Sequence, residues 1–215
     1  LRLARALVHG PGFGHVSART EKFGRQLLAQ LLSLCPSPNA TDPDHARLFP
    51  DGDPQSKRLS DPDRVLARLD TFIAAYGGRA LLFETWATKP SLFELVVLLF
   101  DRSEFLAETA IRTPDLVDEL ELSGYLRQCK SAEQILKDLR HGQDDADQKL
   151  WLRRYHQTEL MRIGLRDILG LADFEQNLVE LSALADACLQ YALEVALRKH
   201  RLRGSSLAIV GLGKL

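Results

Sequence analysis

The chain is poor in cysteine, with three among 215 residues, and these lie far apart at Cys35, Cys129 and Cys188. An odd, scattered set is a poor framework for disulfides, and no CxxC spacing suggests a zinc site. Reduced thiols are typical of a reducing compartment, so we expect a cytoplasmic protein.

Long hydrophobic runs and an excess of one charge are also missing. The longest apolar run, 95–100, is too short to cross a bilayer, and the first eight residues lack the apolar core of a signal peptide. The 28 Lys and Arg residues nearly balance 29 Asp and Glu residues. Proteins that bind nucleic acid or anionic membranes usually carry a basic excess, so we expect neither partner.

Sequence patterns for the common catalytic sites are scarce as well. The six histidines show no HxxxH or HxH spacing, so we do not expect a metal site. Ser205 and Ser206 have no nearby His or Asp pattern that would make a serine nucleophilic, and a turn is the simpler interpretation.

The sequence does contain strong helix periodicity. Ser17 is a candidate N-cap, and Phe23, Leu27 and Leu31 follow at helical spacing. Prolines in first-turn positions and capping residues then mark one helix start after another. We expect helices to begin near residues 17, 61, 80, 90, 103, 114, 131, 144 and 174, with Asp101 or Ser103 as the cap of the fifth.

Two segments interrupt this pattern. Residues 1–16 are ambiguous, because glycines and a proline make 9–14 loop-like. The segment from Cys35 to Ser60 holds five prolines and no apolar period, and so long a loop is uncommon inside a compact domain. We interpret it as a surface insertion between helices that lie together.

The last two helices are the longest and should pack antiparallel across the turn at 170–173. The first, from Asp144 to about Leu171, carries an apolar stripe. The second, from Phe174 to about Arg203, has a heptad seam, and a second row widens its apolar face, so we expect this helix to contact more than one neighbour. The stripe comprises Met161, Leu165, Ile168 and Ala172, the seam comprises Leu178, Leu181, Ala185, Cys188, Ala192 and Val195, and a second row comprises Leu184, Ala187 and Tyr191.

Charged residues share one face of the first long helix. Glu159, Arg162 and Arg166 stand at i, i+3 and i+7. One interpretation is an ion-pair network within the bundle or across to Glu180 and Asp186. The other is a charged wall that faces a nucleotide or a partner protein.

The final residues change character. Residues 207–210 form a short apolar run with β-branched residues, typical of a strand, and Gly211, Gly213 and Lys214 follow. Glycines permit a tight turn whose N–H groups can face a phosphate, and lysine adds charge. The Walker spacing is absent, so a plain turn remains the alternative for these three residues.

The predicted fold class is mainly α, a multi-helix bundle with two long antiparallel helices near the C-terminus and one terminal strand that begins a truncated α/β domain. We divide the chain into an N-terminal helix plus Pro-rich loop (1–60), a short-helix bundle (61–142), a long helical pair (143–204) and the first strand and turn of the truncated domain (205–215).

Three stretches together resemble the glutamine synthetase adenylyltransferase family. Residues 153–172 resemble its "RRF…ELLRIALRDLLGLA" helix, 181–187 its "LSDLADA" segment, and 210–215 its "GMGKLGG" phrase. The likeness extends upstream to 69–120 and covers roughly 17–35 and 60–215. The upstream part resembles the adenylylating half of the family, whereas 153–187 is closer to the adenylyl-removing half in some members.

The resemblance implies a nucleotidyltransferase that moves AMP from ATP to a tyrosine of glutamine synthetase, with its other half removing the AMP. ATP and Mg²⁺ would serve the parent enzyme, held by an Asp-x-Asp that the family carries beyond the position of Leu215. We expect no cofactor and no catalytic residue in these 215 residues. Gly211, Gly213 and Lys214 would begin the nucleotide-side turn, and glutamine synthetase and a PII-type signal protein would be partners. The alternative is a stand-alone helical protein-interaction module.

Overall fold

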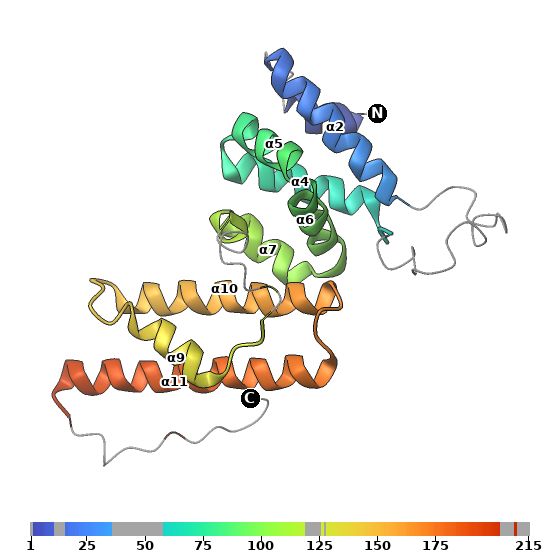
Figure 1. Ribbon diagram of the computed structural model, residues 1–215. Coiled ribbons are helices and arrows are strands. Elements are labelled where there is room, and N and C mark those ends of the chain that lie inside the picture. Colours follow the sequence, from blue (N-terminus) through green and yellow to red (C-terminus); the bar gives the residue numbers. More distant parts are fainter. Residues whose placement is uncertain are drawn as a thin grey trace. The chain divides into compact units, whose positions relative to one another are not determined.

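The computed structural model describes residues 2–10, 16–35, 58–118, 126, 128–202 and 209. The chain divides into two compact units, residues 1–117 and 118–215. Within the described ranges the regular structure is helical and contains no strand, so the mainly α class is confirmed (Figure 1). The expected strand at 207–210 falls outside those ranges apart from residue 209.

The helices of the two units are as follows. Unit 1 contains α1 (Arg2–His9), α2 (Ala18–Leu34), α4 (Pro62–Tyr76), α5 (Arg79–Thr88), α6 (Pro90–Arg102) and α7 (Glu104–Arg112). Unit 2 contains α9 (Ala132–Arg140), α10 (Gln148–Ile168) and α11 (Phe174–His200).

The capping residues begin and end the helices largely where the sequence places them. The Ser17, Asp61, Ser103, Ser131 and Asp173 side chains each accept a backbone N–H from the first turn of their helix. At Ser131 and Asp173 the residue three positions on completes a capping box. These bonds satisfy N–H groups that have no partner inside a helix.

Three boundaries differ from the prediction. α1 forms within the segment that sequence patterns left ambiguous. α10 begins at Gln148 instead of near Asp144, because Asp147 caps it and turns occupy the residues before. α11 ends at His200, before Arg203, and Arg201 follows in a left-handed conformation with φ 53°.

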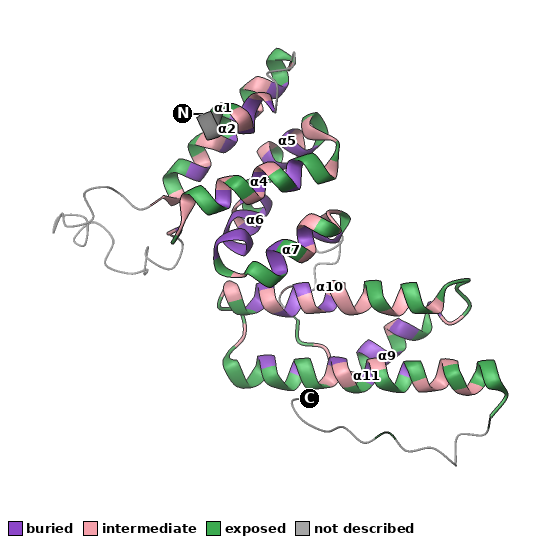
Figure 2. Ribbon diagram, turned by 180° about the vertical axis from the view of Figure 1, so that it is seen from behind, coloured by how far each residue is buried: buried purple, intermediate pink, exposed green. Residues whose placement is uncertain are grey.

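Helix α6 lies at the centre of unit 1, where it contacts α2, α4, α5 and α7. It is buried along nearly its whole length (Figure 2). Its Phe93 and Phe100 rings meet Trp86 and Phe72, with centroid separations of 5.2 Å and 5.6 Å. Aromatic rings at such distances add specific packing to the apolar burial.

The two ends of the Pro-rich segment are joined inside unit 1. The Leu59 N–H donates to the Leu34 carbonyl at 2.9 Å. Next to it, the buried Asp101 carboxylate accepts hydrogen bonds from the Ser60 N–H, the Ser60 hydroxyl and the Asp61 N–H at 2.8–3.1 Å. Asp101 therefore anchors α4 to α6, and Ser103 alone caps α7.

Unit 2 is built on the antiparallel pair α10 and α11, with α9 packed across both. Its core contains Leu184, Ala187 and Tyr191 of α11 against Ile135 and Leu139 of α9, Ile163 of α10 and neighbours. The indole of Trp151 fits over Gly142 so closely that a Cβ there would lie 2.3 Å from it. Glycine at 142 is thus required by packing.

The expectation that α11 contacts more than one neighbour is confirmed, but its heptad seam is less buried than its second row. Leu178, Leu181 and Ala192 are exposed, and Ala185, Cys188 and Val195 are half-buried. The second row, 184, 187 and 191, is buried instead, because α9 and α10 together cover that side of α11. A three-four spacing of apolar residues occurs on both faces, and only packing distinguishes them. On α10, Met161 and Leu165 are buried as expected.

Among the described helices none is both long enough and apolar enough to span a membrane.

Candidate functional site

Six charged side chains meet inside unit 2, and we name them the buried charge cluster. Three are cations and three are anions, so their formal charges balance. They come from α9, α10, α11 and the segment before α9: Lys130, Asp138, Glu159, Arg162, Arg166 and Glu180.

Arg162 is the centre of the cluster. Its side chain is 2% exposed and lies between Glu159, which accepts from its Nε at 2.7 Å, and Glu180, which accepts from its Nη2. Its Nη1 donates to the Gln128 carbonyl at 2.9 Å. Each nitrogen of the guanidinium therefore meets an acceptor, which is the condition for keeping a charge buried.

The other cations share these carboxylates. Lys130 Nζ lies 2.7 Å from Glu159 and 3.0 Å from Asp138, and its backbone N–H donates to Glu180 at 2.8 Å. Arg166 Nε faces the second oxygen of Glu180 at 3.5 Å. Each glutamate thus holds two positive groups.

The electrostatics of the cluster follow from this arrangement. Burial alone would lower the pKa of Arg162, but Glu159 and Glu180 outweigh it and raise that pKa. Burial, with Glu159 and Asp138 nearby, raises the pKa of the Tyr155 hydroxyl, which donates to Asp138 at 3.1 Å. The guanidinium stays charged and the phenol stays neutral across the physiological range.

This geometry favours one of the two interpretations of the charged face. An ion-pair network that reaches Glu180 is present, while Asp186 lies exposed on α11. The carboxylates face cations instead of a vacant space, and in the described part of the chain no three His, Cys, Asp or Glu side chains are grouped to hold a metal ion. The cluster fixes helices and does not fit a magnesium site.

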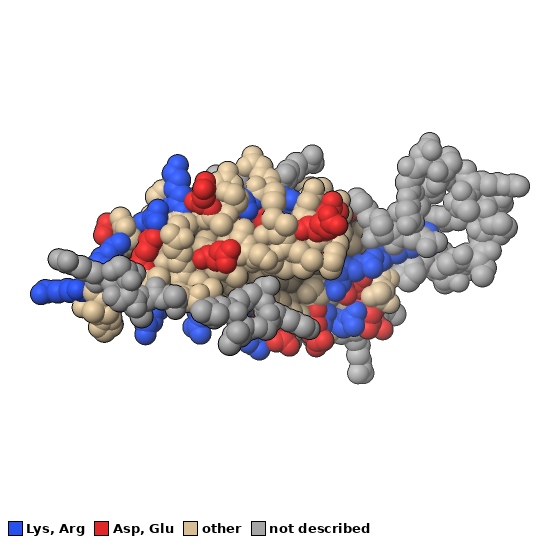
Figure 3. Space-filling model, turned by 90° about the horizontal axis from the view of Figure 1, so that it is seen from below, with Lys and Arg blue, Asp and Glu red and all other residues tan. Residues whose placement is uncertain are grey.

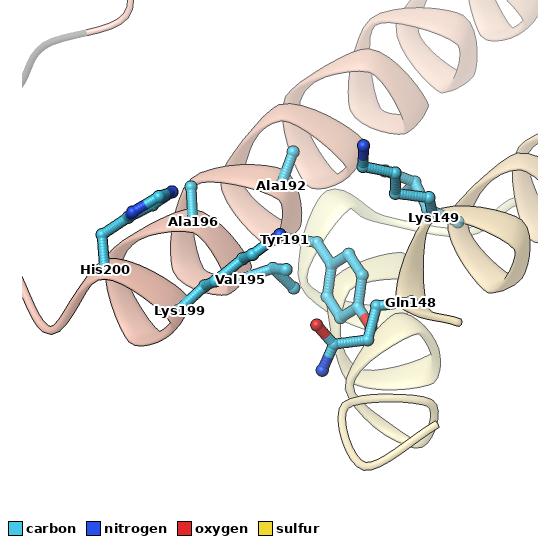
Figure 4. A pocket seen from close by; sticks show the side chains of 9 residues that line it. Gln148, Lys149, Tyr191, Ala192, Val195, Ala196, Lys199 and His200 are labelled. Carbon is cyan, nitrogen blue, oxygen red and sulfur yellow. The ribbon is translucent and has the colours of Figure 1, made fainter. Parts of the chain in front are cut away.

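A groove between α10 and α11 is the second feature of unit 2. One cavity of about 300 Å³ is lined by Leu152, Tyr191, Val195 and neighbouring residues. Figure 4 shows Lys149 and Gln148 of α10 across this cavity from α11, where Lys199 and His200 stand at its end. A second cavity, of about 280 Å³, is lined by Lys149, Leu152, Arg153, His156 and Cys188.

The site residues proposed from the sequence, Gly211, Gly213 and Lys214, lie outside the described residues. The sequence pattern did indicate Glu159, Arg162 and Arg166. It missed Lys130, because that residue reaches the cluster from a segment without helical periodicity. It also missed the groove, because the apolar side of the groove has the residue spacing of a core face.

Comparisons with known proteins identify relatives of this chain. A sequence profile described as glutamate-ammonia ligase adenylyltransferase matches residues 93–215, which includes all of unit 2. A bifunctional glutamine synthetase adenylyltransferase/adenylyl-removing enzyme from Nitrosococcus oceani is 34% identical over 49% of this chain. Proteins of the same name from Aromatoleum aromaticum and Neisseria meningitidis are 28% and 31% identical over 72% and 73% of it.

The matches cover a small part of each relative. The chain spans only 11% to 18% of the length of these curated proteins. No solved structure matches the chain. Because the profile covers more than half of the sequence and continues through the buried charge cluster, the chain belongs to the glutamate-ammonia ligase adenylyltransferase family.

Proposed function

We propose that this chain is the helical portion of a glutamine synthetase adenylyltransferase. The whole enzyme would transfer AMP from ATP to a tyrosine of glutamine synthetase, and its other half would remove it. The observation that carries this proposal is the family match over 93–215, together with relatives whose name states both activities.

Within that enzyme, unit 2 would position a nucleotidyltransferase domain. The α10–α11 pair supports this role, because the buried Arg162–Glu180 ion pair and the apolar core of unit 2 join the two helices. Substrate-positioning elements must be rigid, since small displacements of reacting groups cost large factors in rate.

The chemistry itself would rest on groups outside the described residues. Mg²⁺, held by an Asp-x-Asp beyond residue 215, would neutralise the triphosphate and favour attack by the tyrosine oxygen. Glu159 and Glu180 cannot take this part, because each is ion-paired to two cations. Gly211, Gly213 and Lys214 would begin the nucleotide-side turn. We also propose a cytoplasmic location and a PII-type signal protein as regulator.

A chimera tests the function. Residues 93–215 replace the matching segment of the Nitrosococcus oceani relative, and transfer of labelled AMP from ATP to glutamine synthetase is measured. We expect the chimera to transfer AMP at a rate within about tenfold of that of the parent enzyme. A tenfold loss of rate corresponds to about 1.4 kcal/mol of transition-state stabilisation. An Arg162→Ala chimera should lose transfer, whereas Lys137→Ala, on the exposed face of α9, should not.

A folded chimera without any AMP transfer would contradict the proposal. The coding sequence after residue 215 gives an independent check. Paired glycines followed by Ser-Asp-x-Asp are expected there, and an unrelated continuation would favour a stand-alone helical interaction module.

A further inference from the structure

Three buried polar atoms of unit 2 have no hydrogen-bond partner among the described residues. They are Arg166 Nε on α10, and Asn177 Oδ1 and Glu180 Oε2 on α11. Buried polar atoms in native proteins nearly always have a partner, either in the protein or in ordered water. These three atoms therefore require one.

Bulk solvent does not supply this partner. Figure 3 shows Lys, Arg, Asp and Glu side chains that protrude from one face of the molecule, where water solvates them. In contrast, the side chains of Arg166 and Glu180 are 3% and 0% exposed, and Asn177 is buried as well. Their partner must be held inside the unit.

The three side chains lie at one level of the α10–α11 pair. Arg166 Nε and Glu180 Oε2 are 3.5 Å apart. Asn177 and Glu180 stand three residues apart on α11, so they share a face of that helix. The Asn177 Nδ2 group donates to Asp167 at 2.7 Å, and Asp167 follows Arg166 on α10. Asn177 therefore faces the same part of α10 as Glu180.

Arg166 and Glu180 do not complete each other. Their separation of 3.5 Å is longer than a normal N–H···O hydrogen bond of about 2.7–3.2 Å. Their other atoms are engaged elsewhere, since Arg166 Nη1 donates to the Leu126 carbonyl at 3.4 Å. Glu180 Oε1 accepts from Arg162 Nη2 and from the Lys130 N–H. Arg166 Nε and Glu180 Oε2 are the groups left over.

The orientation of the Asn177 amide is fixed by its partner. Its NH₂ group faces the Asp167 carboxylate, which only accepts hydrogen bonds. Turning the amide over would place two oxygens against each other, so the carbonyl oxygen is the atom that points elsewhere. Asn177 Oδ1 is thus a genuine acceptor without a donor.

The three atoms together select the chemistry of their partner. They offer one N–H donor and two oxygen acceptors, and a water molecule accepts and donates in that proportion. A metal cation would face the Arg166 guanidinium, and an anion would face the Glu180 carboxylate. Buried water molecules typically make about three hydrogen bonds to polar groups that otherwise lack partners.

We propose that one internal water molecule bridges α10 and α11 at this point. Its oxygen accepts from Arg166 Nε–H, and its two hydrogens are donated to Glu180 Oε2 and Asn177 Oδ1. The Cys129 thiol also lies near Glu180, but it is a weak donor and leaves Arg166 and Asn177 unsatisfied. The proposal holds independently of the enzyme function proposed above.

Water-selective NMR on the ¹⁵N-labelled 215-residue chain tests the proposal. We expect a cross-relaxation peak between water and the Arg166 Nε–H, with the sign of a long-lived complex. The Arg162 Nε–H is the internal control, because it donates directly to Glu159 at 2.7 Å and should show a much weaker peak. Through-bond correlations assign both signals. No water peak at Arg166 would overturn the proposal.

A pair of variants counts the water molecule. Arg166→Met removes the donor and keeps an unbranched side chain, whereas Arg153→Met makes the same change at an exposed position of α10. Magnetic relaxation dispersion of solvent ¹⁷O measures the number of long-lived internal waters. Its amplitude should fall by the equivalent of one water in Arg166→Met only. A folded Arg166→Met chain with the parent amplitude would contradict the proposal, and circular dichroism checks folding.

Crystallography and a cysteine variant complete the test. A crystal structure that shows ordered water should contain one peak about 2.7–3.2 Å from all three atoms. Cys129→Ala should leave the water signal of Arg166 unchanged, because the thiol is not part of the bridge. A direct Arg166–Glu180 hydrogen bond without such a peak, or loss of the signal in Cys129→Ala, would refute the bridge.

Discussion

A buried guanidinium surrounded by carboxylates, as Arg162 is in unit 2, is stable only while its partners remain. Removing the guanidinium leaves the negative charges of Glu159 and Glu180 buried with one positive partner fewer each. We expect Arg162→Ala to lower the free energy of unfolding by about 3–5 kcal/mol, the usual result of breaking a buried ion pair. Urea titration followed by circular dichroism measures it.

Arg153→Ala is the control for that change. Arg153 lies on the same helix but is exposed, so its loss should alter stability by less than about 0.5 kcal/mol. If both variants unfolded at the same urea concentration, the cluster would not be holding α10 and α11 together.

Asp101 makes the stability of unit 1 depend on pH. Burial would raise the pKa of its carboxyl, but the hydrogen bonds from Ser60 and Asp61 and the charge of Arg102 outweigh burial and lower that pKa. A carboxyl whose folded pKa lies below its unfolded value of about 3.9 contributes its full stability above that pH. This contribution is lost as the pH falls through the folded pKa.

Asp101→Asn should therefore be less stable at pH 7 by about 1–3 kcal/mol, since buried donors lose a charged acceptor. The difference from the parent should shrink as the pH falls below about 4, because the unfolded carboxyl is protonated there first and the folded carboxyl only at its lower pKa. Thermal melts between neutral pH and about pH 3 compare the two chains. A difference that stays constant over that whole range would contradict this account of Asp101.

At the scale of the element, α11 shows how far sequence patterns reach. Its start and its antiparallel partner were predictable, because the turn at 170–173 is a local signal. Which of its two apolar faces is buried was not. Leu178 and Leu184 are equal in chemistry, and only contacts with α9 and α10 decide that Leu184 is 1% exposed.

Leucine truncation separates the two faces. Leu184→Ala should lower the free energy of unfolding by about 2–5 kcal/mol, because it opens a cavity in the core of unit 2. Leu178→Ala should cost less than about 1 kcal/mol, since its side chain is 47% exposed and alanine is the better helix former. Chemical denaturation measures the free energy of unfolding of both variants. Equal decreases would mean that the heptad seam is buried as a core face as well.

The whole chain combines predictable and unpredictable parts. The helical class and most helix starts in unit 1 could be predicted, because prolines and capping residues mark them. α1 could not, since its eight residues are too few to form a stable helix alone and depend on contacts with α2 and α4. The buried charge cluster was partly predictable, since the pattern indicated Glu159, Arg162, Arg166 and Glu180, but Lys130 and Asp138 join it only through the fold.

The Pro-rich segment makes a prediction at this scale. Since Leu34 and Leu59 are hydrogen-bonded to each other, a short linker can replace residues 36–57 without moving α2 or α4. Replacement by about six Gly and Ser residues should stabilise the chain by about 1 kcal/mol, because a shorter loop costs less closure entropy. Differential scanning calorimetry measures it, and a drop in melting temperature would mean that the segment contributes to packing.

The balanced charges between α10 and α11 have a mechanical consequence. Sliding one helix past the other by a single turn would separate Arg162 from Glu180 and leave each charge buried without its partner. The free energy of such an arrangement would be higher by several kcal/mol, about what breaking a buried ion pair costs, so the slide is strongly disfavoured. The pair therefore moves as a stiff lever about 40 Å long, from the length of 27 residues at about 1.5 Å each. We therefore expect a displacement of the Gly170 turn to move the basic end of α11 with it.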